Sequence, residues 1–426
     1  MVFDKWNKNR RLRKMLKEEL ASSIKIRPYE KCSGLVIGKL GAGNKKCLDY
    51  LPYPNVLAIG NMGSWKMGAV VKPVCERAIR DGHSVVVVSG KAEAYNDLHT
   101  MFEQAGYTVK HVNFYDLQES DSWNCLNWVR SKKTKVEKGF AASEIALNLL
   151  DSADEPKALK NSAVSLLKAL ILRLDAGDSG GGGKETLADI YDMLCRSDAA
   201  EYIDSLFSKA FSPEIHDRVV NAYESWKKEL NMIGEEKRQS VFDAITRALM
   251  VLKDENAKRV LTGEDVDFSV IGKEKCAYFV SCPVPATKCT PFAPLFTEIA
   301  FRSMIDENSD EIHGEIILLN TGAYDCRIRN LDLMVEIAKE RNCAFCITES
   351  PYGIDSSYKN DISGIAANCD IVDVLGERVG EDDVPFLRTK ADDKTLSDLK
   401  LYDLGVKEVA VFIRQEKPFI VNKANC

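Results

Sequence analysis

Residues 55–68 read NVLAIGNMGSWKMG, a short apolar run that leads into a loop with three glycines. The separation of Gly60 from Lys66 matches the motif GxxxxGK[ST], in which backbone N–H groups hold phosphate and the lysine adds a positive charge. Two positions depart from this motif. Trp65 replaces the glycine that lets the backbone approach phosphate, and Met67 replaces the hydroxyl that binds Mg²⁺. The stretch therefore predicts a strand followed by a phosphate-binding loop that lacks half of its motif.

The sequence on both sides of this loop predicts a βαβ unit. After the loop, apolar residues at helical spacing continue to a stop signal at Asp81-Gly82, and the run SVVVVS at 84–89 is typical of a strand buried on both faces. A second helical pattern ends at Gly106 and is followed by the strand pattern YTVKHVNF. The loop thus lies between a strand and a helix, which is the context that a phosphate-binding loop requires.

The rest of the chain is first helical and then returns to strands. Residues 134–262 carry two apolar stripes at helical spacing, formed by Ala163, Leu166, Leu167, Leu170, Ile171 and Leu174 and by Val241, Ile245, Ala248, Leu249 and Leu252. Strand patterns recur at 277–282, 315–320, 344–348 and 370–376, and a hairpin pattern, VAVFIRQEKPFIV, comes last. We predict an α/β domain with a parallel sheet, residues 33–130 and 263–426, that is interrupted by an all-helical domain, residues 131–262.

The composition bounds the class of protein. Of the 426 residues, 45% are hydrophobic and 29% are charged, which is typical of a soluble globular protein. The sequence contains no run of about 18 apolar residues, so we expect no membrane-spanning helix and a cytoplasmic location. The formal charge of -6 argues against nucleic-acid affinity over the whole surface.

Neither the cysteines nor the histidines predict a metal site. The 13 cysteines lack the spacing of disulfide frameworks and zinc sites, and Cys343 and Cys346 lie in a strand pattern that points their thiols to opposite faces. The five histidines form no ligand cluster. We therefore expect reduced, mostly buried thiols and no bound metal.

Residues 1–32 are interpreted as a separate N-terminal segment with a basic stretch, KWNKNRRLRKMLK, at 5–17. Apolar residues fall roughly on one side of the predicted helix: Phe3, Trp6, Leu12, Leu16 and Leu20. A basic amphipathic helix of this kind binds an anionic membrane surface or a partner protein. Three alternatives stay open, which are a peripheral contact with the inner face of the membrane through residues 1–20, docking on a partner, and packing against the chain's own domain.

With these pieces in order, the chain resembles the TraG/TraD class of type IV secretion coupling proteins, which are hexameric P-loop ATPases of conjugation. The stretch NVLAIGNMGSWKMGAVVKP is similar to their first strand, phosphate loop and helix, and SVVVVSGKAEAY takes the place of their strand that ends in D-P-K-G-E. The stretch GYTVKHVNFYDLQESDSWNCL, the helical insertion and the strands IILLN and NCDIVDVLG follow in the family's order. The resemblance covers residues 33–380 and implies a P-loop, RecA-like fold.

The resemblance also assigns the positions of the nucleotide site, and several of them have lost the expected residue. The phosphate lysine corresponds to Lys66, whereas the magnesium-binding hydroxyl corresponds to Met67. The aspartate and glutamate of the second nucleotide motif correspond to Asn320 and Thr321. Asparagine is a weaker metal ligand, and threonine cannot act as a general base. The resemblance therefore implies a site without its magnesium ligands and its base.

Three further positions follow from the same comparison of motifs. The D-P-K-G-E stretch corresponds to residues 89–93, so that Lys91 and Glu93 are kept and the aspartate is lost. A glutamine after a later strand corresponds to Glu349, which sets a negative charge where the outermost phosphate would lie. Lys339 and Arg341 take the place of an arginine-containing interface segment.

The remnant of the nucleotide site predicted in this way comprises Gly60, Gly63, Ser64, Trp65, Lys66, Met67, Lys91, Glu93, Asn320, Thr321 and Glu349. We expect Trp65 and Met67 to fill the empty cavity, since an indole buries about 150–250 Å². We further expect Lys66 to pair with Glu349 and Asn320 to cap or bridge its loop. No catalytic residue is expected.

The leading hypothesis is a catalytically inactive relative of the coupling ATPases that acts through binding. Its partners would be a relaxase–DNA complex or an active coupling-protein paralogue, and no cofactor is expected. Weak ATP binding through Lys66 and assembly into a ring stay open. Two other hypotheses remain, which are a divergent ATP-dependent DNA-transfer motor and a nucleic-acid-binding module unrelated to transfer.

Overall fold

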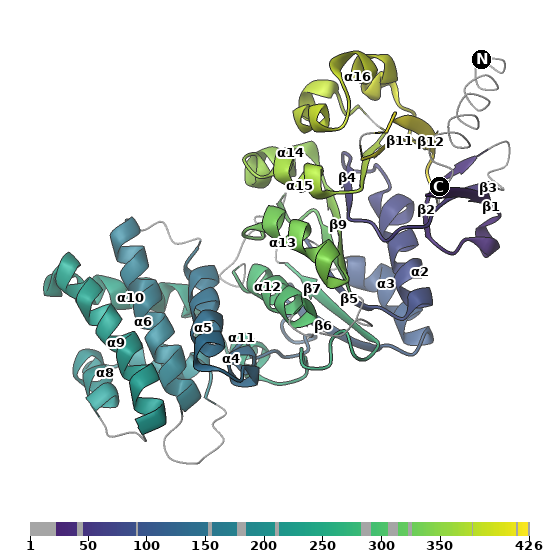
Figure 1. Cartoon of the computed structure of the whole chain (residues 1–426). Helices are drawn as coiled ribbons and strands as arrows, with labels where there is room; N and C mark the ends of the chain where they lie inside the picture. The colour runs from purple at the N-terminus through teal and green to yellow at the C-terminus, as the bar shows by residue number, and fades with distance from the viewer. Residues whose placement is uncertain are drawn as a thin grey trace. The chain divides into compact units, whose positions relative to one another are not determined.

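Figure 1 shows the chain in a computed structural model. The structure describes residues 23–40, 46–90, 93–151, 156–176, 185–208, 213–282, 291–305, 314–322, 326–376, 378–414 and 416–424. Most of the predicted N-terminal segment, including its basic stretch, lies outside the described residues, as does Lys91.

Twelve strands of the described residues form one sheet in the order β1-β3-β2-β12-β11-β10-β4-β9-β8-β5-β7-β6. Their bounds are β1 Ile24–Arg27, β2 Leu35–Leu40, β3 Lys46–Tyr50, β4 Val56–Ile59, β5 Ser84–Ser89, β6 Thr108–Asn113, β7 Cys276–Ser281, β8 Gly314–Leu319, β9 Cys343–Glu349, β10 Ile371–Leu375, β11 Glu408–Ile413 and β12 Phe419–Asn422. The neighbouring strands from β10 to β7 are parallel, and those from β10 to β1 are joined by antiparallel pairs. The predicted α/β fold is confirmed.

The parallel strands are those that the sequence marks most clearly. Every residue of β4, β5, β7, β8, β9 and β10 is buried, as expected for strands covered on both faces. Each follows a predicted strand pattern within one or two residues, and the predicted hairpin is confirmed as β11 and β12. The short strand β1 was not predicted, and it places residues 24–27 in the sheet rather than in a separate N-terminal segment.

The loop at 60–66 joins β4, inside the parallel part of the sheet, to a long helical segment. This segment begins with a π-helical turn, η2 (Met67–Val71), and continues as α2 (Lys72–Asp81) until Gly82, whose φ of 80° ends it. Ala69, Val70 and Val74 pack into the same core cluster as Ala58 of β4. Because burying a valine contributes roughly 1.5–3 kcal/mol, this packing fixes the helix on the sheet.

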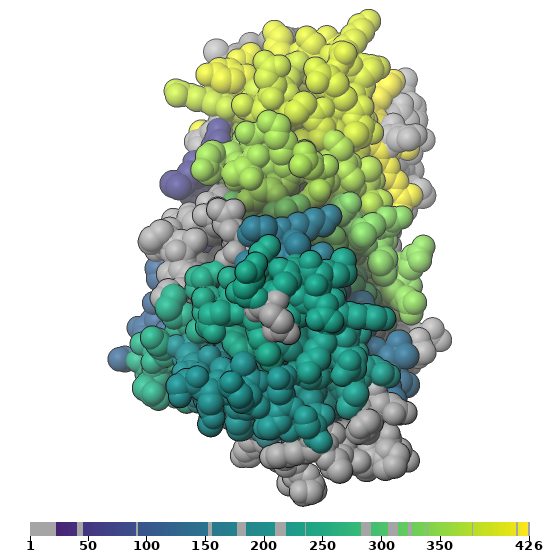
Figure 2. Space-filling view, turned by 90° about the vertical axis from the view of Figure 1, so that its left-hand side faces the viewer, coloured from purple at the N-terminus to yellow at the C-terminus, as the bar shows by residue number. Residues whose placement is uncertain are grey.

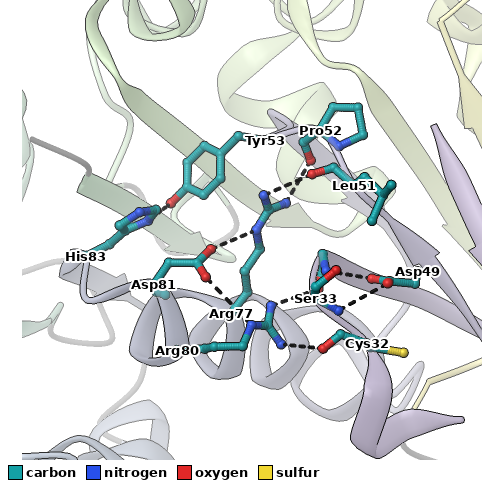
Figure 3. A network of polar contacts seen from close by, with 12 residues as sticks. Cys32, Ser33, Asp49, Leu51, Pro52, Tyr53, Arg77, Arg80, Asp81 and His83 are labelled. Atoms are coloured by element: carbon teal, nitrogen blue, oxygen red, sulfur yellow. Dashed lines mark hydrogen bonds and ion pairs between the residues drawn. The ribbon is translucent and has the colours of Figure 1, made fainter. Parts of the chain in front are cut away.

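Polar contacts anchor the carboxyl end of α2 (Figure 3). Arg77 donates to the carbonyl oxygens of Leu51 at 3.3 Å and Pro52 at 2.7 Å, in the segment that leads to β4. Arg80 donates to the carbonyl oxygen of Cys32 at 3.3 Å. The helix is thus held at its carboxyl end as well as along its apolar face. This fixes the position of its amino end, where the loop at 60–66 joins it.

Helices α3 (Glu93–Gln104), α13 (Leu331–Ala338), α14 (Pro351–Gly353), α15 (Ile362–Asn368) and α16 (Asp393–Leu399) accompany the strands in Figure 1, whereas most of α12 (Phe292–Ile305) belongs to the second unit. Two short helical turns lie on either side of β9 in the chain. These are a 3-10 turn, η6 (Lys339–Arg341), before β9, and a π-helical turn, η7 (Ile354–Tyr358), after β9.

A second unit is built from helices. It contains α4 (Leu126–Ser131), α5 (Lys135–Leu150), α6 (Lys157–Ala176), α7 (Leu187–Leu194), α8 (Ala199–Ser208), α9 (Pro213–Ile233), α10 (Arg238–Ala248) and α11 (Glu255–Thr262). The predicted stripe from Ala163 to Leu174 is buried, which makes α6 the central helix. In the space-filling view of Figure 2, the teal residues of these helices form one continuous surface.

The boundaries of the two units differ from the prediction. The first unit contains residues 1–109, 270–282 and 301–426, and the second contains 110–269 and 283–300. The predicted boundaries were 130/131 and 262/263. The reason lies in tertiary contacts within the second unit, where the rings of Trp123 and Phe296 lie 4.9 Å apart and the N–H of Ser122 donates to Asp265 at 2.9 Å. These contacts bring residues on both sides of the predicted helical domain, 131–262, into the second unit.

Candidate functional site

The loop at 60–66 follows β4 and contains two residues in the left-handed conformation. Its first N–H, that of Gly60, donates to the carbonyl oxygen of Glu349 at 3.0 Å, so the loop begins in register with the end of β9. A side chain at Gly60 would meet Ser64, whose Oγ would lie 2.3 Å from the added Cβ. Gly63 has a φ of 86° and Trp65 a φ of 64°. Such left-handed positions turn successive N–H groups in a short loop toward a common centre.

Trp65 does not fill a cavity, so that prediction is wrong. The side chain of Trp65 is 57% exposed. Met67 is half-buried and packs against the main core cluster, and its filling of a nucleotide cavity stays a prediction. The backbone decides the outcome, because a left-handed residue at this point of the loop carries its side chain outward into solvent. The motif prefers glycine at this position for its conformation, and the indole occupies that conformation at a cost.

We expect Trp65→Gly to be more stable than Trp65→Ala by about 1 kcal/mol, because only alanine keeps a Cβ in the left-handed conformation. Both variants lose the same exposed indole, so their comparison isolates the backbone strain. Chemical denaturation of the two variants measures the difference. Equal stabilities would show that Trp65 is not strained.

Lys66 turns back onto its own loop. Its Nζ donates to the carbonyl oxygen of Gly60 at 2.6 Å and to that of Asn61 at 3.3 Å, rather than making the hydrogen-bonded pair with Glu349 that we expected. Burial lowers the pKa of Lys66 to about 8, with Glu349 acting against this and Lys423 in its favour. Glu349 therefore interacts with the ammonium group of Lys66 electrostatically and without a hydrogen bond. The hydrogen bonds of that ammonium group go to the two loop carbonyls.

Lys423 is a component of the site that the sequence did not indicate. It follows β12, is only 1% exposed, and donates from Nζ to the carbonyl oxygen of Ser64 at 2.8 Å. The contact orients the Ser64–Trp65 peptide, since its C=O and its N–H point in opposite directions. No local pattern could have revealed it, because Lys423 and Ser64 are 359 residues apart in the chain.

Glu349 lies at the carboxyl end of β9 and is 1% exposed. Its Oε1 accepts from the N–H of Gly322 at 2.7 Å and from the hydroxyl of Thr321 at 3.3 Å. Burial raises the pKa of Glu349 to about 7, and the two hydrogen bonds and the charge of Lys66 oppose that rise. The hydroxyl of Tyr358, on η7, lies 3.1 Å from that of Thr321. The structure thus brings Thr321, Glu349 and Lys66 together.

Asn320 turns the chain after β8. Its φ is 53°, a left-handed conformation that asparagine tolerates better than most residues, and its N–H donates to the carbonyl oxygen of Thr348 at 2.7 Å. Within the described residues, its buried Oδ1 has no hydrogen-bond partner. Among the residues that the structure describes, the side-chain oxygen of Asn320 therefore takes no part in capping or bridging the loop.

The remaining predicted residues lie at different edges of the sheet. Glu93 begins α3 after β5, at the carboxyl edge where the loop also lies, and its side chain is exposed. Lys339 and Arg341 lie in η6, which precedes β9 and therefore belongs to the opposite edge. The structure does not bring these two residues to the loop of their own chain.

The residues of this edge do not suit a magnesium ion. Met67 offers a thioether that packs into the core, and Mg²⁺ requires oxygen ligands. Within the part of the chain that the structure describes, no group of three or more histidine, cysteine, aspartate or glutamate side chains could hold a metal. The phosphate lysine of the motif is kept at Lys66, whereas the hydroxyl that would bind Mg²⁺ is replaced by Met67.

A parallel sheet with a phosphate-type loop between β4 and a helix defines a P-loop NTPase-like protein. The sequence matches the model of the family described as "Type IV secretory system Conjugative DNA transfer" over residues 5–319. The chain therefore belongs to this family and is a component of conjugative DNA transfer or type IV secretion. No curated protein matches the chain.

Several solved structures have folds similar to that of this chain. VirB4 of Thermoanaerobacter pseudethanolicus gives a TM-score of 0.58 at 11% identity, with 92% of this chain and 97% of that chain covered. The unbound bacterial conjugative coupling protein TrwB gives 0.56 at 11% identity, covering 87% and 86%. TrwB in complex with a non-hydrolysable ATP analogue gives 0.54 at 12% identity, covering 87% and 85%. At these identities the similarity establishes the P-loop ATPase-like fold.

Proposed function

We propose that this chain is a catalytically silent member of its family that acts through binding. The observation that carries the proposal is Met67, which stands directly after the phosphate lysine and packs its thioether into the core. Asn320 and Thr321 supply neither a metal-binding carboxylate nor a general base at the end of β8. Glu349 faces Lys66 with a carboxyl group of opposite charge, where an incoming phosphate would have to compete with it.

The number of missing catalytic groups supports an inactive site rather than a slow one. Phosphoryl transfer depends on positioned charge, and removing one stabilising group commonly costs on the order of 10² to 10³ in rate. Here the hydroxyl, the aspartate and the glutamate of the site are absent at Met67, Asn320 and Thr321. Such losses do not multiply fully, yet together they leave little rate enhancement.

The proposed partners follow from the family. TrwB is a bacterial conjugative coupling protein, and this chain shares its fold without the complete set of nucleotide-site residues. A relaxase–DNA complex or an active coupling-protein paralogue is the partner that such a chain would bind, and assembly into a ring with the paralogue belongs to the same proposal. Of the helices in the described residues, none is long and apolar enough to cross a membrane.

The proposal is tested by ATP turnover of the purified protein with Mg²⁺. We expect turnover far below about 1 s⁻¹, which is the slow end of ordinary enzymes. Lys66→Ala serves as the matched control, because it removes the phosphate lysine and should leave the residual rate unchanged. A rate near that value that is lost in Lys66→Ala would refute silence.

One observation favours a divergent motor as the second candidate. The carboxyl of Glu349 lies against the hydroxyl of Thr321, the position where the resemblance places the catalytic glutamate, and burial brings the pKa of Glu349 to about 7. A carboxylate with this pKa could act as a general base from the neighbouring strand. Loss of measurable turnover in Glu349→Gln would support this candidate, and absence of turnover in both proteins would exclude it.

A further inference from the structure

Three titratable side chains meet at the amino edge of the parallel strands, the edge opposite to the loop at 60–66. Glu315 lies at the beginning of β8, His83 lies directly before β5, and Tyr53 lies in the segment that leads to β4. Glu315 and His83 are only 4% and 6% exposed. The hydroxyl of Tyr53 is hydrogen-bonded both to Nδ1 of His83 and to the carboxyl of Glu315. Figure 3 shows the phenol of Tyr53 directed at the imidazole of His83.

The phenol of Tyr53 has one proton to donate, and two acceptors compete for it. A neutral Glu315 donates its own proton to the phenol oxygen, which leaves the phenol proton for Nδ1 of His83. An ionised Glu315 can only accept, so it takes the phenol proton, and Nδ1 then faces the lone pairs of the phenol oxygen. That contact stays favourable only if Nδ1 carries a proton and donates it. The direction of both hydrogen bonds therefore depends on one proton at Glu315.

We propose that Glu315, Tyr53 and His83 form a proton-linked switch, in which loss of the Glu315 proton reverses both hydrogen bonds of the Tyr53 hydroxyl. In the protonated state Glu315 donates to Tyr53, and Tyr53 donates to Nδ1 of His83. In the ionised state Nδ1 of His83 donates to Tyr53, and Tyr53 donates to Glu315. One proton leaves Glu315 for water. The imidazole stays neutral, because its own proton moves from Nε2 to Nδ1 by exchange with water.

Burial and the charges around Glu315 place its ionisation near neutral pH. Burial raises the pKa of Glu315 to about 8, while the hydrogen bond from Tyr53 and the charge of Arg77 oppose this rise and the charge of Asp81 adds to it. Burial and the charge of Glu315 raise the pKa of Tyr53 well above its usual range, so the phenol keeps its proton in both states. Glu315 also acts on three thiols whose pKa values burial raises, which are Cys75 of α2 and Cys343 and Cys346 of β9. These thiols stay neutral, so the ionisation belongs to Glu315.

The backbone of His83 is fixed independently of its ring. Its N–H donates to the carbonyl oxygen of Ala78 at 2.9 Å, and its carbonyl oxygen accepts from the hydroxyl of Tyr107 at 2.9 Å. Burial raises the pKa of Tyr107 to about 12, so this phenol also stays neutral. The ammonium of Lys275 lies 5.8 Å from the centroid of the Tyr107 ring. The backbone contacts need no change between the two states, so the switch acts on the hydrogen bond of the imidazole.

The switch lies within the network that anchors the carboxyl end of α2 (Figure 3). The guanidinium of Arg77 lies 4.5 Å from the centroid of the Tyr53 ring, and Asp81 accepts from Nε of Arg77 at 3.3 Å. Both residues belong to α2, and His83 follows the end of this helix. The proton on Glu315 therefore sets the polar contacts at the point where α2 passes into β5.

The test is nuclear magnetic resonance of the full chain with isotope-labelled histidine and glutamate, titrated from about pH 6.5 to about pH 9.5. Protonated and unprotonated ring nitrogens resonate at different frequencies, so the spectrum reports which nitrogen carries the proton. The signals of His83 are those missing from His83→Gln. As the pH rises through about 8, the pKa of Glu315, we expect Nδ1 of His83 to gain a proton and Nε2 to lose one. The carboxyl carbon of Glu315 should titrate with the same midpoint.

Three variants separate the members of the switch. Glu315→Gln cannot ionise, so the His83 ring should keep one state over the whole range. Tyr53→Phe keeps the ring that contacts Arg77 and removes the hydroxyl, so His83 should no longer follow the titration of Glu315. The matched control is Glu349→Gln, which neutralises another buried glutamate with a raised pKa, at the opposite edge of the sheet, and should keep the wild-type change.

The wild-type titration decides the proposal even where a variant does not fold. Ring nitrogens of His83 that keep their frequencies while the Glu315 carboxyl titrates would overturn it, as would different midpoints for the two groups. The wild-type change in Glu315→Gln or in Tyr53→Phe would contradict it as well. None of these outcomes depends on a nucleotide or a partner, so the proposal fails separately from catalytic silence.

Discussion

Asp373→Asn is expected to raise the stability of the protein near pH 8 by roughly 2–5 kcal/mol, one of the largest effects of a single substitution in this chain. Asp373 lies in the middle of β10, opposite Ala58 of β4 and Val411 of β11. It is 5% exposed, and its Oδ1 has no hydrogen-bond partner within the described residues. Burial alone raises the pKa of Asp373 to about 8.

The direction of the pH effect follows from proton binding. The folded protein keeps the proton on Asp373 up to about pH 8, whereas the unfolded chain loses it near the ordinary value of 3.8. Between these values the folded state binds more protons, so the stability of the wild-type protein falls as the pH rises. The contribution of Asp373 to stability is complete below the pKa of this group in the unfolded chain. It is lost as the pH rises to the pKa of the same group in the folded protein.

Thermal unfolding of both proteins at about pH 5 and about pH 8 measures this effect. The variant should gain most at the higher pH and little at the lower one. Glu315 and Glu349, whose pKa values burial raises to about 8 and about 7, add slopes of the same sign, so the variant flattens the pH dependence without abolishing it. Asp355→Asn, at an exposed aspartate, is the matched control and should leave the slope unchanged. An unchanged slope in Asp373→Asn would show that Asp373 is ionised in the folded protein.

Asn55→Leu is expected to lower the free energy of unfolding by about 3 kcal/mol, because it leaves buried backbone groups without partners. Asn55 is fully buried directly before β4. Its Nδ2 donates to the carbonyl oxygen of Val335 at 2.9 Å, and its Oδ1 accepts from the N–H of Phe345 at 2.9 Å. Leucine has the same branched shape and the same number of side-chain heavy atoms, and it can replace neither bond. The residue therefore joins the beginning of β4 to α13 and β9.

Chemical denaturation of Asn55→Leu against the wild-type protein tests this role. The matched control is Asn96→Leu, at an exposed position of α3, which should change stability by less than about 0.5 kcal/mol. The variant should also disturb the phosphate loop, since β4 carries the loop at its other end. A loss as small as that of the control would mean that water replaces the side chain of Asn55.

The exposure of Trp65 changes the interpretation of how this site differs from a complete nucleotide site. The loop is not closed by bulky side chains, because the indole is directed to solvent and the backbone keeps its left-handed turn. What has been lost is the set of oxygens that would hold a metal, at Met67 and at Asn320 and Thr321. These losses are the reason for proposing that the site no longer transfers a phosphoryl group.

The sequence by itself determined the elements of the fold and the place of the site. Runs such as SVVVVS at 84–89 and the stripe on α6 are local patterns whose burial follows from their periodicity, so they predicted β5 and a central helix without knowledge of their neighbours. The spacing from Gly60 to Lys66 likewise located the loop.

Only the tertiary structure decided what the site residues touch. The direction of Trp65 depends on a backbone angle, and the support from Lys423 joins residues at opposite ends of the chain. The protonation of Glu349 and Asp373 depends on how completely the fold removes them from water, which spacing along a sequence does not encode. The boundaries of the two units differ from the predicted ones for the same reason. Contacts such as that between Trp123 and Phe296 form between segments that are far apart in the sequence.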